Sequence, residues 1–155
     1  MQDATLDRQI EIMRWTYGLV PIAAGADKFT NLLTEWSKYL SPRARDVLPV
    51  STRTFMRAVG VIEIAAGALV LNKKTSRIGA YVVGGWLGAI AANLIANRSY
   101  DIAVRDIVMG VGAISLGRML ARKLAQREEE RRTPATDDRA RMTQGLDAES
   151  AYAMH

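Results

Sequence analysis

The sequence predicts an all-α integral membrane protein, a four-helix bundle with an extra amphipathic helix in the first connection. Residues 78–97 carry no charge, and a helix of this length, at about 1.5 Å per residue, spans the roughly 30 Å hydrocarbon core of a bilayer. Three further apolar blocks are bounded or interrupted by a few charges. The alternative is a soluble bundle with one buried helix, but soluble helices show a polar face and residues 78–97 show almost none.

The first helix is expected near residues 10–27. Residues 15–26, WTYGLVPIAAGA, are free of charge between Arg14 and Asp27. Ala-Gly-Ala at 24–26 resembles a signal-peptide cleavage pattern, but the preceding segment is long and carries three acidic residues, whereas a signal n-region is short and positive. We therefore expect an uncleaved helix.

The connection that follows, roughly residues 28–53, contains the run FTNLLTEWSKYLSP. Its apolar side chains recur every three or four residues, which is typical of a helix. We expect an amphipathic helix near residues 29–41 that ends at Pro42 and lies on the outer membrane surface, with Trp36 and Tyr39 in the interfacial belt. The alternative is a partly buried re-entrant helix that caps the bundle.

Three more helices are expected near residues 54–72, 78–97 and 101–120. The connections NKKTSR (72–77) and RSYD (98–101) are short, so consecutive helices should pack as antiparallel neighbours. Residues 1–122 would then form the transmembrane domain.

Residues 123–155 are highly charged and should form a flexible cytoplasmic tail. Glu128 and Arg132 stand four residues apart, so the fourth helix should run on to near Arg132. Pro134 should end it. The remainder is either solvated and disordered alone or orders on a partner.

Charge asymmetry predicts the orientation. Four spans place both termini on one side, and most of the 21 Lys and Arg residues fall in segments on that side. The turn NKKTSR is the strongest local signal. The positive-inside rule then places both termini in the cytoplasm of a bacterial inner membrane.

Glu63 stands in the apolar run VGVIEIAAG (59–67). A charge at a helix centre raises the free energy of membrane insertion by about 2.5–3.5 kcal/mol, which is roughly the amount by which the apolar residues around Glu63 lower it. Gly60 and Gly67 share its face and permit close helix packing, so Glu63 should point into the bundle towards a partner. Arg105 lies at a similar depth, within about 8 Å along the bundle axis, and is the partner we expect.

The ionisable residues of the outer half define a predicted buried polar cluster, which is a candidate for function or a salt-bridge network that fixes the helices. Its members are Asp27, Lys28, Arg57, Glu63, Asp101, Arg105 and Asp106. Small residues on helix faces predict a second set, for helix packing against the bundle or a partner subunit. Its members are Gly60, Gly67, Gly84, Gly88 and Gly110.

Composition limits the chemistry. The chain has no cysteine and its single histidine is His155, so we expect no metal site and no cofactor bound through side chains. The net charge of +5 comes from basic residues that flank apolar blocks, which favours membrane lipids over nucleic acid as the partner.

Two segments resemble DoxX-like proteins. RWTYGLVPIAAGADKF (14–29) resembles their first helix, and VGVIEIAAGALVL (59–71) resembles their second, with its G-x-x-E-x-x-x-G core. The resemblance covers roughly residues 10–120, whereas the long first connection and charged tail depart from the shortest members. The positions that match are Arg14, Gly18, Gly25, Lys28, Gly60, Glu63 and Gly67.

The resemblance implies a four-helix membrane protein. Named DoxX-like members include a subunit of a thiosulfate:quinone oxidoreductase and components of other redox assemblies. The absence of cysteine and of a recognised catalytic motif, together with glycine-rich helix faces and the charged tail, favours a non-catalytic accessory or anchoring subunit that binds other membrane subunits. The alternative is a small carrier or quinone-site protein that uses Glu63, Arg105 and Asp106, with a quinone or a lipid as its ligand.

Overall fold

The computed structural model describes residues 2–152, and the side chains of residues 4–132. This part of the chain contains helices and no strand, which confirms the predicted all-α fold. The elements in chain order are α1 (Gln2–Thr30), the 3-10 helix η1 (Trp36–Tyr39), α2 (Pro42–Val47), α3 (Thr52–Leu71), α4 (Ser76–Ala96) and α5 (Tyr100–Tyr152).

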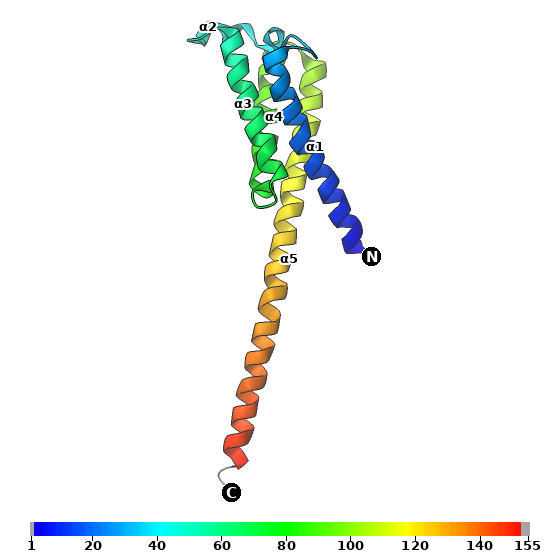
Figure 1. The fold of residues 1–155 in the computed structure, drawn as a ribbon, viewed down its shortest axis with the longest axis vertical. Coiled ribbons are helices and arrows are strands. Elements are labelled where there is room, and N and C mark those ends of the chain that lie inside the picture. Colours follow the sequence, from blue (N-terminus) through cyan, green and yellow to red (C-terminus); the bar gives the residue numbers. More distant parts are fainter. Residues whose placement is uncertain (1, 153–155) are drawn as a thin grey trace. The chain divides into compact units, whose positions relative to one another are not determined.

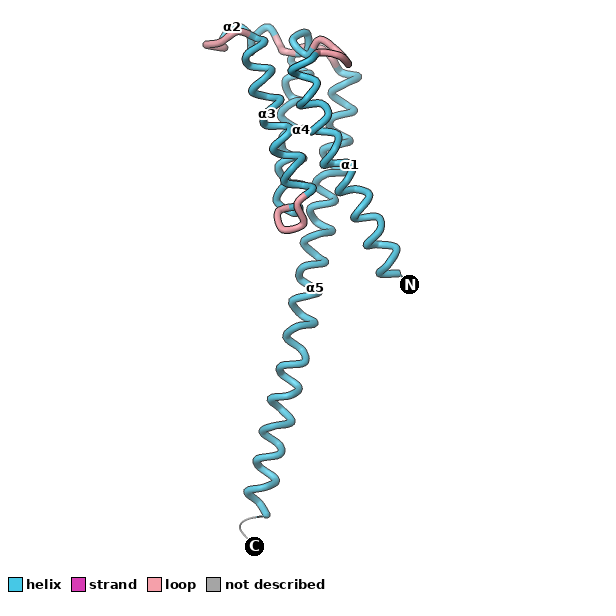
Figure 2. Tube along the Cα trace, viewed as in Figure 1, coloured by secondary structure: helices cyan, strands magenta, loops and turns pink. Residues whose placement is uncertain are grey.

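The chain forms two compact units, the first ending at Leu120 and the second beginning at Ala121. In the first, α1, α3, α4 and the part of α5 up to Leu120 form a helical bundle (Figure 1). The non-helical segments of this unit gather at its ends (Figure 2): the α1–α3 connection and the α4–α5 turn at one, the α3–α4 turn at the other. The second unit is the remainder of α5.

The surface of the bundle is apolar. Large apolar side chains are exposed on every long helix of the first unit, among them Trp15, Val61, Val82 and Val108. The helices α3 and α4 are each long and apolar enough to cross a membrane. An apolar exterior around buried charges is the arrangement that a lipid environment requires, so the first unit is a helical membrane bundle.

Glycines on α1 and α3 let these two helices touch backbone to backbone. A Cβ added to Gly25 would stand 2.5 Å from the carbonyl oxygen of Gly60, and one added to Gly67 would overlap the carbonyl oxygen of Gly18. The two contacts are seven residues apart on each helix, which fits an antiparallel pair whose facing stripe repeats every two turns.

The apolar core lies between all four helices of the bundle. Gly84 of α4 faces Gly110 and Ile114 of α5, so these helices also approach closely. The buried residues that form the core are Ile10, Ala66, Val70, Ala80, Val83, Ala113 and Leu116.

The first connection differs from the single helix predicted near residues 29–41. It contains η1 and α2, and Leu32 and Leu33 are exposed in an irregular segment. The helix α1 ends at Thr30 because Asn31 adopts a left-handed φ of 51°, and asparagine tolerates that conformation better than most residues. An extra helix is therefore present in this connection, but in two short pieces with other bounds.

Pro42 begins a helix instead of ending one. It occupies the first turn of α2, and the hydroxyl of Ser41 accepts a hydrogen bond from the backbone N–H of Ala44. Proline is well suited to this position, because its missing N–H would have no helical partner there.

The helix α5 runs through Pro134 to Tyr152, so the prediction that Pro134 ends the helix is wrong. A proline removes one helical hydrogen bond, and the surrounding residues include many Ala, Arg, Glu and Gln, which favour helix. Flexibility of residues 123–155 stays a prediction, and His155 lies outside the described residues.

Candidate functional site

A buried ion pair joins α1 to α3. Lys28 Nζ lies 2.5 Å from Glu63 Oε2, and the two side chains are 4% and 7% exposed. The ammonium group also lies 3.5 Å from the carbonyl oxygen of Ala24 and 3.7 Å from the centre of the Trp36 ring. Its three N–H bonds therefore have a carboxylate, a carbonyl and an aromatic face to meet.

The predicted pairing of Glu63 with Arg105 is wrong. Arg105 bonds to its neighbour Asp106 instead, with Nε and Nη2 at 3.0 and 2.9 Å from Oδ1, and its side chain is 61% exposed. The close contact of α1 with α3 places Lys28 within reach of Glu63, whereas the long arginine side chain extends to the bundle surface.

The predicted polar cluster divides into two groups. Asp27, Lys28, Glu63 and Asp106 are buried, and Glu63 and Asp106 line the same cavity. The remaining members, Arg57, Asp101 and Arg105, have exposed side chains on the surface of the bundle.

Asp27 anchors the loop after α1. Its carboxylate accepts hydrogen bonds from the backbone N–H groups of Leu32 and Leu33 at 2.8 and 3.1 Å, from Thr30 Oγ1 at 3.1 Å and from Trp36 Nε1 at 2.7 Å. Bonds to a carboxylate are stronger than those between neutral groups. Asp27 therefore fixes Trp36 above the Lys28 ammonium.

Asn93 of α4 holds the other end of the same loop. Its side-chain oxygen accepts from the backbone N–H of Ser41 at 3.1 Å, and its Nδ2 donates to the carbonyl oxygen of Tyr39 at 2.8 Å. One amide thus satisfies two loop backbone groups. Together with Asp27 it fixes η1 at this end of the bundle.

A partly open cavity of about 560 Å³ lies between the helices beneath this loop. Residues of α1, η1, α2, α3, α4 and α5 line it, and most are apolar or aromatic. The aromatic lining residues are Tyr17, Trp36, Tyr39, Phe55 and Trp86, and the charged ones are Lys28, Glu63, Arg105 and Asp106. The ion pair therefore forms part of the wall of a chamber.

Trp86 of α4 presents a buried hydrogen-bond donor at this wall. Its Nε1 faces the Glu63 carboxylate but meets no partner at hydrogen-bond geometry among the described residues. The indole N–H therefore lies beside a carboxylate without a well-formed hydrogen bond to it.

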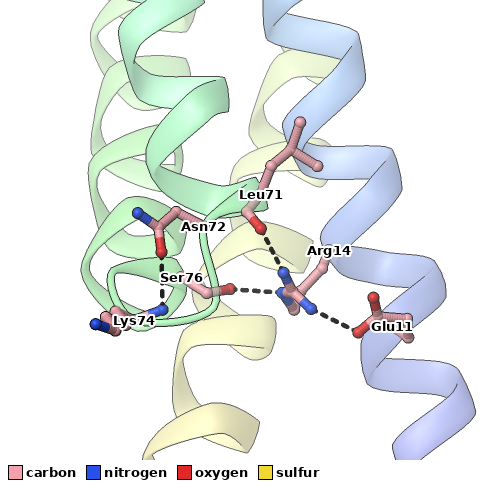
Figure 3. A network of polar contacts seen from close by, with 6 residues as sticks. All are labelled: Glu11, Arg14, Leu71, Asn72, Lys74 and Ser76. Carbon is pink, nitrogen blue, oxygen red and sulfur yellow. Dashed lines mark hydrogen bonds and ion pairs between the residues drawn. The ribbon is translucent and has the colours of Figure 1, made fainter.

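A second polar centre lies at the other end of the bundle (Figure 3). Arg14 of α1 donates from Nε to the hydroxyl of Ser76 at 3.1 Å and from Nη2 to the carbonyl oxygen of Leu71 at 2.5 Å, and Nη1 pairs with Glu11. The Leu71 carbonyl is one that the end of α3 leaves unsatisfied. Arg14 therefore ties α1 to the turn between α3 and α4.

The predicted packing glycines also separate into two groups. Gly60, Gly67, Gly84 and Gly110 lie where backbones approach. Gly88, like Gly85 beside it, faces open space, where an added Cβ would meet no atom within 4 Å. Packing inside the bundle therefore does not explain Gly88.

Sequence reasoning missed Asn93 and Ser76 as members of polar networks and Trp86 as a buried hydrogen-bond donor. A signal for Asn93 was available, since it is a polar residue inside the uncharged block 78–97. The described residues contain no group of three or more His, Cys, Asp or Glu side chains that could hold a metal ion.

The fold and its buried charges define a small helical membrane protein with a chamber near one end of the bundle. Residues 7–104 match the family described as methylamine utilisation protein MauE, and since the match covers more than half of the chain, the protein belongs to this family. It is a membrane family, as the resemblance to DoxX-like proteins implied, but the family matched is MauE. No curated protein and no solved structure matches the chain.

Proposed function

We propose that this protein is a non-catalytic accessory subunit that anchors or stabilises another protein in the membrane, in the methylamine utilisation for which its family is named. The proposal rests on one observation: the buried charged side chains join elements of the bundle to one another. Lys28 and Glu63 join α1 to α3, Arg14 joins α1 to the α3–α4 turn, and Asp27 holds the first connection. Side chains engaged in this way hold the bundle in one arrangement.

The exposed glycines of α4 support a protein partner. Glycine lowers helix stability by about 1 kcal/mol relative to alanine, and close packing accounts for most of the bundle's glycines. Gly85 and Gly88 have no such contact inside the bundle. A helix of another subunit could approach here, as small residues allow between membrane helices.

Purification in mild detergent, with mass spectrometry of the co-eluting proteins, tests the proposal. We expect a membrane partner that is retained by the wild type and lost from Gly88→Leu, while the variant melts at the wild-type temperature. Val108→Leu, on an exposed apolar position of α5, is the matched control and should keep the partner. Elution of the wild-type protein alone from its native membrane would contradict the proposal.

A redox complex linked to quinone is the finer form of the proposal, and the resemblance to DoxX-like proteins supports it. Oxidoreductase subunits among the retained proteins would favour it. The alternative is a small carrier that uses the buried cluster itself. It predicts transport by the isolated protein in vesicles and no loss of activity on Gly88→Leu.

The proposed orientation has both termini in the cytoplasm of a bacterial inner membrane. Because the chain has no cysteine, single cysteines report topology without background. Lys38 and Lys74 are exposed at opposite ends of the bundle. In intact spheroplasts, a membrane-impermeant maleimide should label Lys38→Cys and leave Lys74→Cys unlabelled. The reverse pattern would invert the orientation.

A further inference from the structure

We propose that the chamber beneath the first connection binds a neutral, ring-bearing molecule with a hydroxyl head group, of the alkylphenol type. The hydroxyl would accept a hydrogen bond from Trp86 Nε1 and donate one to the Glu63 or Asp106 carboxylate. This site is distinct from any surface that binds a partner subunit, and it does not rest on the accessory role proposed above.

The size of the chamber fits an organic ligand. Its volume of about 560 Å³ lies within the range of about 300–1,000 Å³ that is typical of ligand pockets, whereas one water molecule takes up about 30 Å³ in the liquid. Its walls come from every long helix of the bundle and from the loop that Asp27 and Asn93 fix in place.

The polar atoms of the wall select the head group. The Lys28 ammonium is fully engaged by Glu63, the Ala24 carbonyl and the Trp36 ring. Trp86 Nε1 is a buried donor that meets no partner among the described residues. Each ionised carboxylate has about four acceptor positions, and Glu63 and Asp106 use only part of theirs, on Oε2 and Oδ1.

A hydroxyl group can bond to the indole donor and to a carboxylate acceptor at the same time. Its oxygen can accept the proton of Trp86 Nε1 and its own O–H can donate to a carboxylate. A ketone or an ether accepts a hydrogen bond but cannot donate one, so it would make no hydrogen bond to the carboxylate. A molecule without polar atoms would leave the indole N–H with only its approach to the Glu63 carboxylate, which falls short of hydrogen-bond geometry.

Charge favours a neutral ligand. Lys28 is paired with Glu63 and Arg105 with Asp106, so the ionisable side chains of the wall balance one to one. A cationic or anionic head would add an uncompensated charge to an apolar chamber, which is costly inside a membrane.

The aromatic lining selects the body of the ligand. Trp36, Tyr39, Phe55 and Trp86 line the chamber, and aromatic pairs in offset or edge-to-face contact gain stability beyond their buried area. An aromatic ring that carries the hydroxyl directly, with an apolar tail among the aliphatic residues, fits this surface.

The test uses the full chain in lipid nanodiscs and three probes that differ in one group: para-heptylphenol, para-heptylanisole and heptylbenzene. In a Trp15→Phe background the remaining tryptophans, Trp36 and Trp86, both line the chamber, so tryptophan fluorescence reports its occupation. We expect saturable quenching by the phenol, with affinity about tenfold or more above that of the ether and the hydrocarbon. Empty nanodiscs correct for partition into lipid.

Two variants locate the contact. Trp86→Phe keeps an aromatic ring and removes the N–H, and should lower phenol affinity about tenfold while leaving heptylbenzene affinity unchanged. Both variants are measured in the Trp15→Phe background, and Val108→Leu, at an apolar position exposed on the bundle surface, serves as the control. In isotope-labelled wild-type protein, the indole N–H resonance of Trp86 should shift on addition of the phenol and not of the hydrocarbon.

Equal affinity for the three probes would overturn the assignment of a hydroxyl head, and leave an apolar chamber only. Tighter binding of heptyltrimethylammonium than of the phenol would overturn the assignment of a neutral ligand. No saturable binding of any probe would overturn the site. None of these results bears on co-purification of a partner, so the two proposals fail independently.

Discussion

Replacing Lys28 by methionine should cost this bundle more stability than replacing any exposed basic residue. Methionine keeps most of the apolar stem and removes the ammonium group. The Glu63 carboxylate, 7% exposed in its side chain, would then lose the cation that compensates its charge. Breaking a buried pair from one side costs about 3–5 kcal/mol, because the remaining charge stays buried.

Removing both charges should cost far less than the sum of the single changes. Replacing a whole buried ion pair by apolar groups is often neutral or stabilising, so the double variant Lys28→Met with Glu63→Met should regain at least about 2 kcal/mol of the single losses. Arg57→Met is the matched control. Arg57 lies on α3 near Glu63 but is exposed, and its change should stay within about 0.5 kcal/mol.

The free energy of unfolding in detergent, followed by circular dichroism for the wild type, both single variants and the double variant, gives the coupling energy of the pair. A second cycle, with Glu63→Met and Arg105→Met, should be additive within about 0.5 kcal/mol. If the Lys28 cycle were additive and the Arg105 cycle strongly coupled, the pairing described above would be refuted and the pairing expected from the sequence restored.

Three further perturbations separate the structural roles. Asp27→Ala leaves two loop N–H groups without their acceptor, so backbone amides of residues 31–40 should exchange with deuterium at least about tenfold faster, while those of the α3 and α4 interiors are unchanged. Arg14→Met leaves the Leu71 carbonyl unsatisfied, so the free energy of unfolding measured by detergent denaturation should fall by about 2 kcal/mol. An unchanged free energy of unfolding would show that Arg14 does not join the helices. Gly67→Ala should destabilise the bundle by about 1–3 kcal/mol, because the added Cβ would meet the backbone of α1. Gly85→Ala should be neutral or stabilise the bundle by up to about 1 kcal/mol. Equal effects of the two variants in the same melts would contradict the close packing of Gly67 against α1.

The membrane-bundle fold could be predicted because it depends on local signals. The uncharged block is long enough to span a membrane and has short polar turns on either side. These signals predict helix ends within two residues of those of α3 and α4. The first connection could not be predicted in the same way. Its apolar spacing is helical, but the Asp27 carboxylate supplies a tertiary acceptor for the N–H groups of Leu32 and Leu33, and this competes with helix formation.

The interior position of Glu63 followed from the cost of burying a charge, whereas its partner did not. Arg105 is the expected partner because it lies at a similar depth to Glu63 along the bundle axis. Depth does not indicate which helices are neighbours. Lys28 was available in the same half of the bundle. The two glycine pairs between α1 and α3 were the missing information, because they show that these helices are in contact and Glu63 lies on the stripe between Gly60 and Gly67.

The glycine contact and the ion pair depend on each other. Lys28 follows Gly25 by three residues and Glu63 follows Gly60 by three, so each charged residue lies on the same helix face as its glycine, about one turn away. Since Gly25 and Gly60 touch, the two axes come close enough for the 2.5 Å ion pair to form without solvent between them. A larger residue at either glycine would separate the helices and weaken the pair together with the packing. The spacing G-x-x-K on α1 and G-x-x-E on α3 is therefore one unit, in which the small residue sets the distance and the charged residue fixes the orientation.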